Sequence, residues 1–211
     1  MTKIKAVLFD MDGVLIDAKE WHYEALNRAL AEYGYTITRQ EHLTTYDGLP
    51  TRVKLNKLTQ DKGLPASLHD IINQKKQEYT VEIAKELCKP RPIHEYALSK
   101  LKSEGYHMAV GSNSIRGTIE LMIGRANLTK YFDFMLSNQD VTKPKPDPEI
   151  YQTAMKRMGL QPQECLICED NKNGIAAAIA SGGHLFKVGT VDDVTYDNIK
   201  NRIAEIEHVG R

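Results

Sequence analysis

The residues best suited to chemistry lie in short acidic and polar motifs. The first motif, Asp10-Met11-Asp12-Gly13-Val14-Leu15, directly follows the apolar run of residues 4–9. Two carboxylates two residues apart on a turn can hold a hard cation, while one acts as a nucleophile and the other transfers a proton. Gly13 lets the chain turn sharply. Taken alone, this motif could equally be an ordinary acidic turn.

Three further polar motifs follow other apolar runs or helices. In Gly111-Ser112-Asn113-Ser114, hydroxyl and backbone N–H groups can hold a phosphate. Glu169-Asp170-Asn171 supplies acids suited to completing a divalent-metal site. Residues 142–148 place Lys143 and Lys145 among alternating prolines that restrict the backbone. A lysine there is either a surface charge or a rigidly aimed cation.

Short apolar runs predict the strands that position these motifs: residues 4–9, 106–110, 134–136, 165–168 and 184–188. Helical patterns lie between them at residues 95–103, 115–125, 148–158 and 174–180. This alternation predicts an α/β fold with a Rossmann-like, doubly wound parallel sheet. The carboxyl ends of such strands lie along one edge of the sheet, so we expect the motifs to meet there.

One segment interrupts this alternation. Residues 17–87 contain only helical patterns, at 18–33, 52–61 and 68–86, before a proline-rich return at residues 88–92. We therefore expect a helical cap domain at residues 17–87, inserted after the first strand. Residues 1–16 and 88–211 would form the catalytic core.

Composition excludes several classes of protein. The 211 residues carry 28 Lys plus Arg and 28 Asp plus Glu, and the mean hydropathy is −0.45. Without clustered positive charge, neither nucleic acid nor an anionic membrane is expected as a partner. No apolar stretch approaches the ~20 residues needed to span a bilayer. With three cysteines and no signal-type start, we expect a cytoplasmic protein, monomeric or weakly dimeric, in which Cys165 and Cys168 belong to a buried strand.

The ordered motifs resemble those of the haloacid dehalogenase superfamily, and nearly the whole chain is covered by the resemblance. Residues 10–15 look like its first motif, Ser112 its second, Lys143 its third and Glu169-Asp170 its fourth. The position and length of the insert resemble the helical cap of the β-phosphoglucomutase-like branch.

This resemblance implies roles for individual residues. Asp10 would be the nucleophile that forms an aspartyl-phosphate, and Asp12 the general acid and base. Asp10, the backbone carbonyl of Asp12, and Asp170 would bind Mg²⁺, supported by Glu169. Ser112, with the neighbouring Asn113, and Lys143 would hold the transferring phosphoryl group, and Lys145 is expected to be a surface charge.

The resemblance also points to substrate contacts in the cap and beside the phosphate loop. Trp21-His22 resembles an aromatic and histidine pair of the branch, and residues 48–52 resemble its Gly-x-x-x-Arg loop. The expected contacts are His22, Arg52, Lys75 and Arg116. Trp21 could equally belong to the core of its helix.

The function expected from the resemblance is hydrolysis of a small phosphorylated metabolite, a sugar or polyol phosphate, by a Mg²⁺-dependent phosphatase. A hexose-phosphate mutase is the alternative, but Ile115 and Arg116 stand where mutases of this branch have a Lys and an Asn. A haloacid dehalogenase would leave Asp12, Glu169 and Asp170 without a task. A non-catalytic binding protein would not need these carboxylates.

Overall fold

The centre of the molecule is a parallel sheet of five strands. The computed structural model describes residues 3–209. Its strands are β1 (Ala6–Phe9), β2 (His107–Gly111), β3 (Phe134–Leu136), β4 (Cys165–Glu169) and β5 (His184–Lys187), in the order β3-β2-β1-β4-β5. β1 and β4 are buried along their whole length, which explains their continuous apolar runs. The α/β fold expected from the sequence is confirmed.

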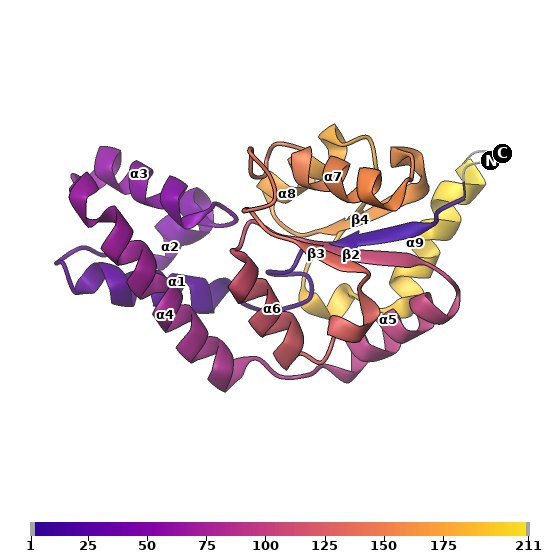
Figure 1. The fold of residues 1–211 in the computed structure, drawn as a ribbon, viewed down its shortest axis with the longest axis horizontal. Helices are drawn as coiled ribbons and strands as arrows, with labels where there is room; N and C mark the ends of the chain where they lie inside the picture. The colour runs from indigo at the N-terminus through magenta and orange to yellow at the C-terminus, as the bar shows by residue number, and fades with distance from the viewer. Residues whose placement is uncertain (1–2, 210–211) are drawn as a thin grey trace.

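Helices cover both faces of the sheet (Figure 1). On one face lie α7 (Glu149–Met158) and α8 (Lys172–Ala180). On the other lie α5 (Pro92–Ser103), α6 (Arg116–Arg125) and α9 (Tyr196–Val209). Side chains of β1 point alternately to the two faces. Ala6 and Leu8 pack in a first apolar cluster with α7 and α8, and Val7 and Phe9 pack in a second cluster with α5, α6 and α9. The sequence analysis did not predict α9, whose Ile199 and Ile203 are buried in the second cluster.

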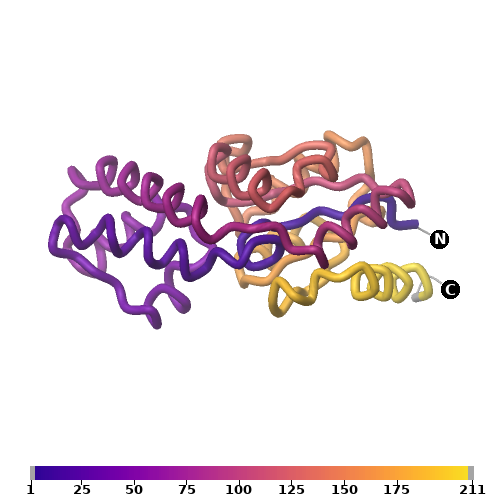
Figure 2. Tube along the Cα trace, turned by 90° about the horizontal axis from the view of Figure 1, so that it is seen from below, coloured from indigo at the N-terminus to yellow at the C-terminus, as the bar shows by residue number. Residues whose placement is uncertain are grey.

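The segment between β1 and α5 forms a separate lobe of helices, at the left of Figures 1 and 2. It contains α1 (Lys19–Ala31), α2 (Arg39–Glu41), a π-helical turn η1 (His42–Tyr46), α3 (Thr51–Lys62), the 3₁₀ turn η2 (Ala66–Leu68) and α4 (His69–Leu87). Other 3₁₀ turns lie in the core, at η3 (Thr129–Tyr131), η4 (Pro162–Glu164) and η5 (Val191–Asp193). The helical lobe has its own apolar cluster, which includes Leu26, Leu55 and Ile72.

The chain crosses between sheet and helical lobe twice, at residues 15–18 and 88–91. Figure 2 shows α1 and α4, which adjoin these crossings, running side by side. The first crossing leaves a tight turn in which the Ile16 N–H donates to the Met11 carbonyl at 2.9 Å. Met11, Val14 and Leu15 of this turn are buried, so that end of the lobe is anchored in the core. Within residues 3–209 no helix has both the length and the apolar character needed to cross a membrane.

Candidate active site

The two aspartates of the first motif lie at the carboxyl end of β1, the central strand of the sheet. Asp10 is 4% exposed, and its N–H donates to the Cys168 carbonyl of β4. Gly13 follows with a φ of +86°, and a Cβ there would lie 2.0 Å from Oδ2 of Asp170. Only glycine permits both this conformation and this close approach. The turn thereby brings the acids after β1 against those after β4.

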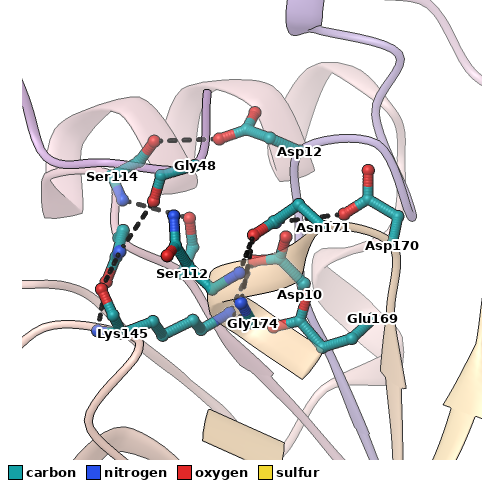
Figure 3. Close-up of polar contacts among 12 residues, drawn as sticks. Asp10, Asp12, Gly48, Ser112, Ser114, Lys145, Glu169, Asp170, Asn171 and Gly174 are labelled. Atoms are coloured by element: carbon teal, nitrogen blue, oxygen red, sulfur yellow. Dashed lines mark hydrogen bonds and ion pairs between the residues drawn. The ribbon is translucent and has the colours of Figure 1, made fainter. Parts of the chain in front are cut away.

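Asp10 belongs to a buried charged cluster with Lys145 and Glu169 (Figure 3). The Lys145 Nζ donates to Asp10 Oδ1 at 2.8 Å and to Glu169 Oε1 at 2.6 Å, and the Tyr151 hydroxyl also donates to that Glu169 oxygen. Burial raises the pKa of Asp10 well above its ordinary value, and the Glu169 carboxylate raises it further against the influence of Lys145. Burial also raises the pKa of Glu169. Burial alone would lower the pKa of Lys145, but both carboxylates outweigh it and raise that pKa.

The positions expected for Lys143 and Lys145 are wrong, because Lys143 lies at the surface and Lys145, expected to be a surface charge, lies beside Asp10. The Lys143 side chain is 72% exposed and lies 3.9 Å from Asp147, whereas the Lys145 side chain is 3% exposed. Two anchors set this register. The N–H groups of Thr142 and Lys143 both donate to the Glu149 carboxylate at the start of α7, and the Lys145 N–H donates to Asn113 Oδ1.

The acids after β1 and β4 form a candidate metal site. Oxygen atoms of Asp10, Glu169 and Asp170 lie within 4.8 Å of one another. Glu169 Oε2 and Asp170 Oδ2 are buried and lack a hydrogen-bond partner among the described residues. The Lys19 Nζ lies 2.7 Å from Asp170 Oδ2 and forms an ion pair with it, but the geometry of this contact is not that of a hydrogen bond. Carboxylates left short of partners are the donor set that a hard divalent cation prefers, so these residues fit Mg²⁺.

Gly174, at the start of α8, leaves room for the Glu169 carboxylate. A Cβ at Gly174 would lie 2.0 Å from the carboxyl carbon of Glu169. The same helix begins with Asn171, whose side chain accepts hydrogen bonds from the N–H groups of Asn173 and Gly174. The helix start and the acids before it are therefore one packed unit.

Asp12 points to the other side of the site and contacts both the core and the helical lobe. Its Oδ2 accepts a hydrogen bond from the Ser114 hydroxyl at 3.0 Å, and its Oδ1 lies 3.1 Å from His22 Nε2 of α1. The second contact is a close polar approach without good hydrogen-bond alignment. Burial alone would raise the pKa of Asp12, but His22 and Ser114 outweigh it and lower that pKa. Asp12 is therefore a carboxylate at rest.

His22 is joined in turn to a second lysine of the helical lobe. The Lys76 Nζ of α4 lies 3.2 Å from His22 Nδ1, and both residues are buried. Burial lowers the pKa of His22 and lowers that of Lys76 to about 7. A neutral His22 that accepts from Lys76 carries its proton on Nε2, the atom that lies 3.1 Å from Asp12.

Ser112 and Asn113, both expected at a phosphate site, directly follow β2 and line the same cavity as Asp10. The Ser112 side chain is buried, and its oxygen accepts from the Ser114 N–H at 3.1 Å. The Asn113 amide instead donates to the Gly48 and Lys145 carbonyls, at 2.9 and 3.1 Å. Its side chain thus holds the Lys145 loop and the helical lobe in place, and its backbone N–H lacks an acceptor within residues 3–209.

A cavity of about 430 Å³ lies between the helical lobe and the sheet. The core contributes Asp10, Asp12, Ser112 and Lys145 to its lining, and the lobe contributes His22, Arg52, Lys54 and Lys76. Two residues expected to contact substrate do not line it. Lys75 lies 3.5 Å from Glu32 on the outside of α4, and Arg116 is ion-paired with Asp140. Arg52 lines the cavity, but its side chain is 77% exposed and paired with Asp70.

The sequence analysis missed two residues of this cavity or its wall, Lys54 and Tyr151, and it selected the wrong lysine on α4. The substrate contact was assigned to Lys75, although its neighbour Lys76 continues the buried stripe formed on α4 by Ile72, Thr80 and Ile83. A lysine within such a stripe is a signal that the sequence carries. No comparable signal marks Lys54, and Tyr151 follows Ile150 on the inner side of α7 without any polar pattern that announces its contact with Glu169.

Comparison with known proteins gives consistent results. The family pattern of haloacid dehalogenase-like hydrolases matches residues 7–188. A phosphorylated carbohydrates phosphatase of Thermotoga maritima is 32% identical over 179 residues, which cover 85% of this chain and 82% of that protein.

Solved structures agree on the fold. A β-phosphoglucomutase from Clostridium difficile superposes with a TM-score of 0.85 at 21% identity, covering 99% of this chain and 100% of that one. The protein CbbY from Rhodobacter sphaeroides, solved in complex with phosphate, superposes with a TM-score of 0.78 at 27% identity, covering 86% and 84%.

Proposed function

This chain belongs to the haloacid dehalogenase-like hydrolase family, and we propose that it is a Mg²⁺-dependent phosphatase that hydrolyses a small sugar or polyol phosphate through an aspartyl-phosphate. The observation that carries the proposal is the cluster of Asp10, Lys145 and the Glu169–Asp170 pair at the end of β1. The phosphatase names of several relatives, including one that acts on phosphorylated carbohydrates, support the reaction class and the substrate class. We further propose that residues 17–87 act as the cap and residues 1–16 and 88–211 as the catalytic core.

Charge compensation is the main requirement of the proposed first step. A phosphate ester is anionic, and at ~4 Å and an effective dielectric near 20 it is repelled by a carboxylate by about 4 kcal/mol per charge pair. Lys145, whose ammonium touches Asp10, offsets this repulsion. Mg²⁺ held by Asp10, the Asp12 carbonyl and Asp170, with Glu169 in support, would supply further positive charge when bound. It would also favour the ionised form of Asp10, whose pKa is otherwise raised.

The covalent steps then follow from Asp10 and Asp12. An Asp10 oxygen forms a bond to phosphorus while the ester P–O bond breaks, and the departing oxygen takes a proton from Asp12. In the second step Asp12 takes a proton from water, the water oxygen bonds to phosphorus, and the Asp10–phosphorus bond breaks. The contacts with His22 and Ser114 keep Asp12 ionised at rest, which suits the second step. An incoming phosphate dianion would raise the pKa of Asp12. This would favour the protonated form of Asp12, which the first step requires.

Phosphate release from p-nitrophenyl phosphate, with Mg²⁺ and with a chelator, tests this proposal. We expect Mg²⁺-dependent turnover by the wild type and none by Asp10→Asn, because an amide cannot form the acyl-phosphate. Turnover of Asp10→Asn at the wild-type rate would reject Asp10 as the nucleophile. Equal wild-type rates with and without chelator would reject the metal.

A product assay separates the phosphatase from a hexose-phosphate mutase. The enzyme is given β-glucose 1-phosphate with a trace of the 1,6-bisphosphate, and glucose 6-phosphate and free phosphate are measured together. We expect free phosphate without isomerisation, in keeping with the pairing of Arg116 to Asp140 away from the cavity. Efficient formation of glucose 6-phosphate with little free phosphate would identify a mutase.

A further inference from the structure

Two lysines neutralise the three carboxylates of the candidate metal site, and they differ in their access to solvent. The Lys145 side chain is 3% exposed and touches Asp10 and Glu169. Asp170, whose side chain has no exposed surface, pairs instead with Lys19, at 2.7 Å between Nζ and Oδ2. The Lys19 side chain is 32% exposed. Of these two cations, Lys19 is therefore the one that can move into solvent.

The Lys19 side chain reaches Asp170 across Gly13. A Cβ at Gly13 would lie 2.0 Å from Asp170 Oδ2 and 2.8 Å from Lys19 Cε, so the ion pair packs directly against this glycine. Burial alone would lower the pKa of Lys19, but the adjoining Asp170 carboxylate outweighs it and raises that pKa, with Asp47 and Asp17 acting in the same direction. Lys19 is thus a charged ammonium held on Asp170.

The helix that carries Lys19 gains no stability from a cation at this position. Lys19 is the first residue of α1, and the N-cap residue Ala18 makes no side-chain capping bond. The N-terminus of a helix carries partial positive charge, so a lysine is unfavourable there. The contact with Asp170 therefore accounts for the position of this lysine better than the helix does.

The Lys19 ammonium and a divalent cation make opposing demands on Asp170. Asp170 Oδ1 accepts a hydrogen bond from the Asn171 amide at 3.2 Å, while Oδ2 is buried and has no hydrogen-bond partner among the described residues. The oxygen without such a partner is the one that Lys19 contacts. Two cations on one buried carboxylate repel each other strongly. By linkage, each must lower the affinity of Asp170 for the other by the same factor.

We propose that Lys19 is a built-in competitor of the divalent metal: its ammonium neutralises Asp170 until the metal binds there, and then moves out toward solvent. The inference rests on the metal site of the proposed function and adds a residue that sets the affinity of that site. Metal binding would also release the start of α1 from the core. The competing explanation is that Lys19 orients the Asp170 carboxylate for the metal, in which case its loss weakens metal binding.

Mn²⁺ titration followed by electron paramagnetic resonance tests the competition without reference to activity. The proteins compared are the wild type, Lys19→Met, Lys19→Arg and Lys172→Met. Lys172 donates to the Thr44 carbonyl, so its variant removes a lysine from the contact between lobe and core without removing the partner of Asp170. Lys19→Met should bind Mn²⁺ about fivefold or more tightly than the wild type, because the competing charge is gone. Lys19→Arg, which keeps the charge, and Lys172→Met should stay within about twofold.

Acetylation of lysines, measured by mass spectrometry, tests whether the ammonium leaves Asp170. An ion pair stabilises the ammonium form of a lysine, and only the neutral amine reacts with an acylating reagent. The acetylation rate of Lys19 in the wild type should therefore rise about threefold or more when Mg²⁺ is added. Lys62, whose side chain is 29% exposed and lies 2.8 Å from Glu41, is the internal reference, and its rate should not change.

Both measurements can contradict the proposal. Unchanged or weaker Mn²⁺ binding by Lys19→Met would overturn it, as would a Lys19 acetylation rate that Mg²⁺ leaves unchanged, or a failure of both the wild type and Lys19→Met to bind Mn²⁺. If circular dichroism shows that Lys19→Met does not fold, Lys19→Gln replaces it, because this variant also removes the charge. A wild type that binds Mn²⁺ but releases no phosphate from p-nitrophenyl phosphate would reject the phosphatase alone, and the two measurements would still decide the role of Lys19.

Discussion

Lys143 and Lys145 differ in environment although only Pro144 separates them. The Lys145 ammonium bridges Asp10 and Glu169 in the interior, while Lys143 lies at the surface beside Asp147. A cation in a dry site stabilises charge in a transition state far more than one in water does. The two residues therefore form a matched pair for mutation.

We expect Lys145→Met to lower kcat/KM by ~10²–10³-fold, the usual cost of removing one preorganised charge-stabilising group. Lys143→Met should stay within about twofold of the wild type, because its side chain is 72% exposed. Steady-state phosphate release by the two variants makes the comparison, with circular dichroism as the folding control. A larger loss for Lys143→Met than for Lys145→Met would contradict the register of the loop.

At the scale of elements, the start of α8 determines how the Glu169 carboxylate lies. Gly174 lies directly against that carboxylate, whereas a Cβ at Gly117, on α6, would have no atom within 4 Å. The same substitution at these two helical glycines should thus have opposite effects.

Gly174→Ala should destabilise the fold by about 1–3 kcal/mol, because the added methyl group overpacks the site. It should also weaken divalent-metal binding, since Glu169 must move. Gly117→Ala should stabilise the fold by up to ~1 kcal/mol through helix propensity. Urea unfolding measures both free energies, and Mn²⁺ titration followed by electron paramagnetic resonance measures metal binding. Equal stability of the two variants would show that the Glu169 carboxylate can move to accommodate a methyl group at position 174.

The π-helical turn η1 buries a histidine whose two ring nitrogens have no hydrogen-bond partner within residues 3–209. Burial, with smaller contributions from Lys54 and His22, lowers the pKa of this residue, His42, to about 4. In the unfolded chain the pKa is ~6.5. Between pH 6.5 and 4 the unfolded state therefore binds more protons, so stability falls as the pH falls through this window.

We expect His42→Phe to reduce the loss of folding stability between pH 6.5 and 4. The reduction should reach up to ~1.4 kcal/mol per pH unit where the unfolded state binds one proton more than the folded state. The aromatic ring should keep the packing against Tyr23, whose ring centroid lies 5.4 Å from that of His42. Unfolding free energies of both proteins at pH 7, 6 and 5 provide the measurement. Parallel pH profiles would mean that His42 is not the group responsible.

At the scale of the molecule, the helical lobe is closed over the sheet edge. Its loop at Gly48 accepts a hydrogen bond from Asn113, and the Thr44 carbonyl accepts one from Lys172. Asn173 also donates to the Asp47 carbonyl, and Lys19 and His22 of the lobe lie against Asp170 and Asp12 of the core. The chain itself crosses between lobe and core only twice within residues 3–209, at residues 15–18 and 88–91 (Figure 2). Such an arrangement suits a lid that opens for substrate exchange.

We predict that the lobe opens by hinging near residues 15–17 and 87–92. Small-angle scattering of the protein with Mg²⁺ should show a smaller radius of gyration when vanadate is added as a phosphate mimic. Lys172→Met, which removes one closing contact, should enlarge the radius without vanadate. Identical scattering curves under all conditions would argue for a fixed lobe.

The local sequence pattern was sufficient to predict the sheet and the acidic residues of the site. The alternation of short apolar runs with helical segments predicted the sheet, because strands buried on both faces consist mainly of apolar residues. Asp10, Asp12, Glu169 and Asp170 were predicted together because acids directly after adjacent parallel strands must share one edge. α9 was not predicted.

Other features depend on contacts between segments far apart in the chain. Asn113 and Glu149 decide which of the two lysines enters the site. Glu149 accepts a hydrogen bond from the Lys143 N–H and Asn113 accepts one from the Lys145 N–H, and these bonds fix the loop. Lys75 and Lys76 differ by about 100° around α4. The packing of α4 against α1 turns Lys76 toward His22 and leaves Lys75 outside. Neighbouring lysines are alike in a sequence, and only the tertiary structure decides which one is buried, because burial depends on what the rest of the chain places against it.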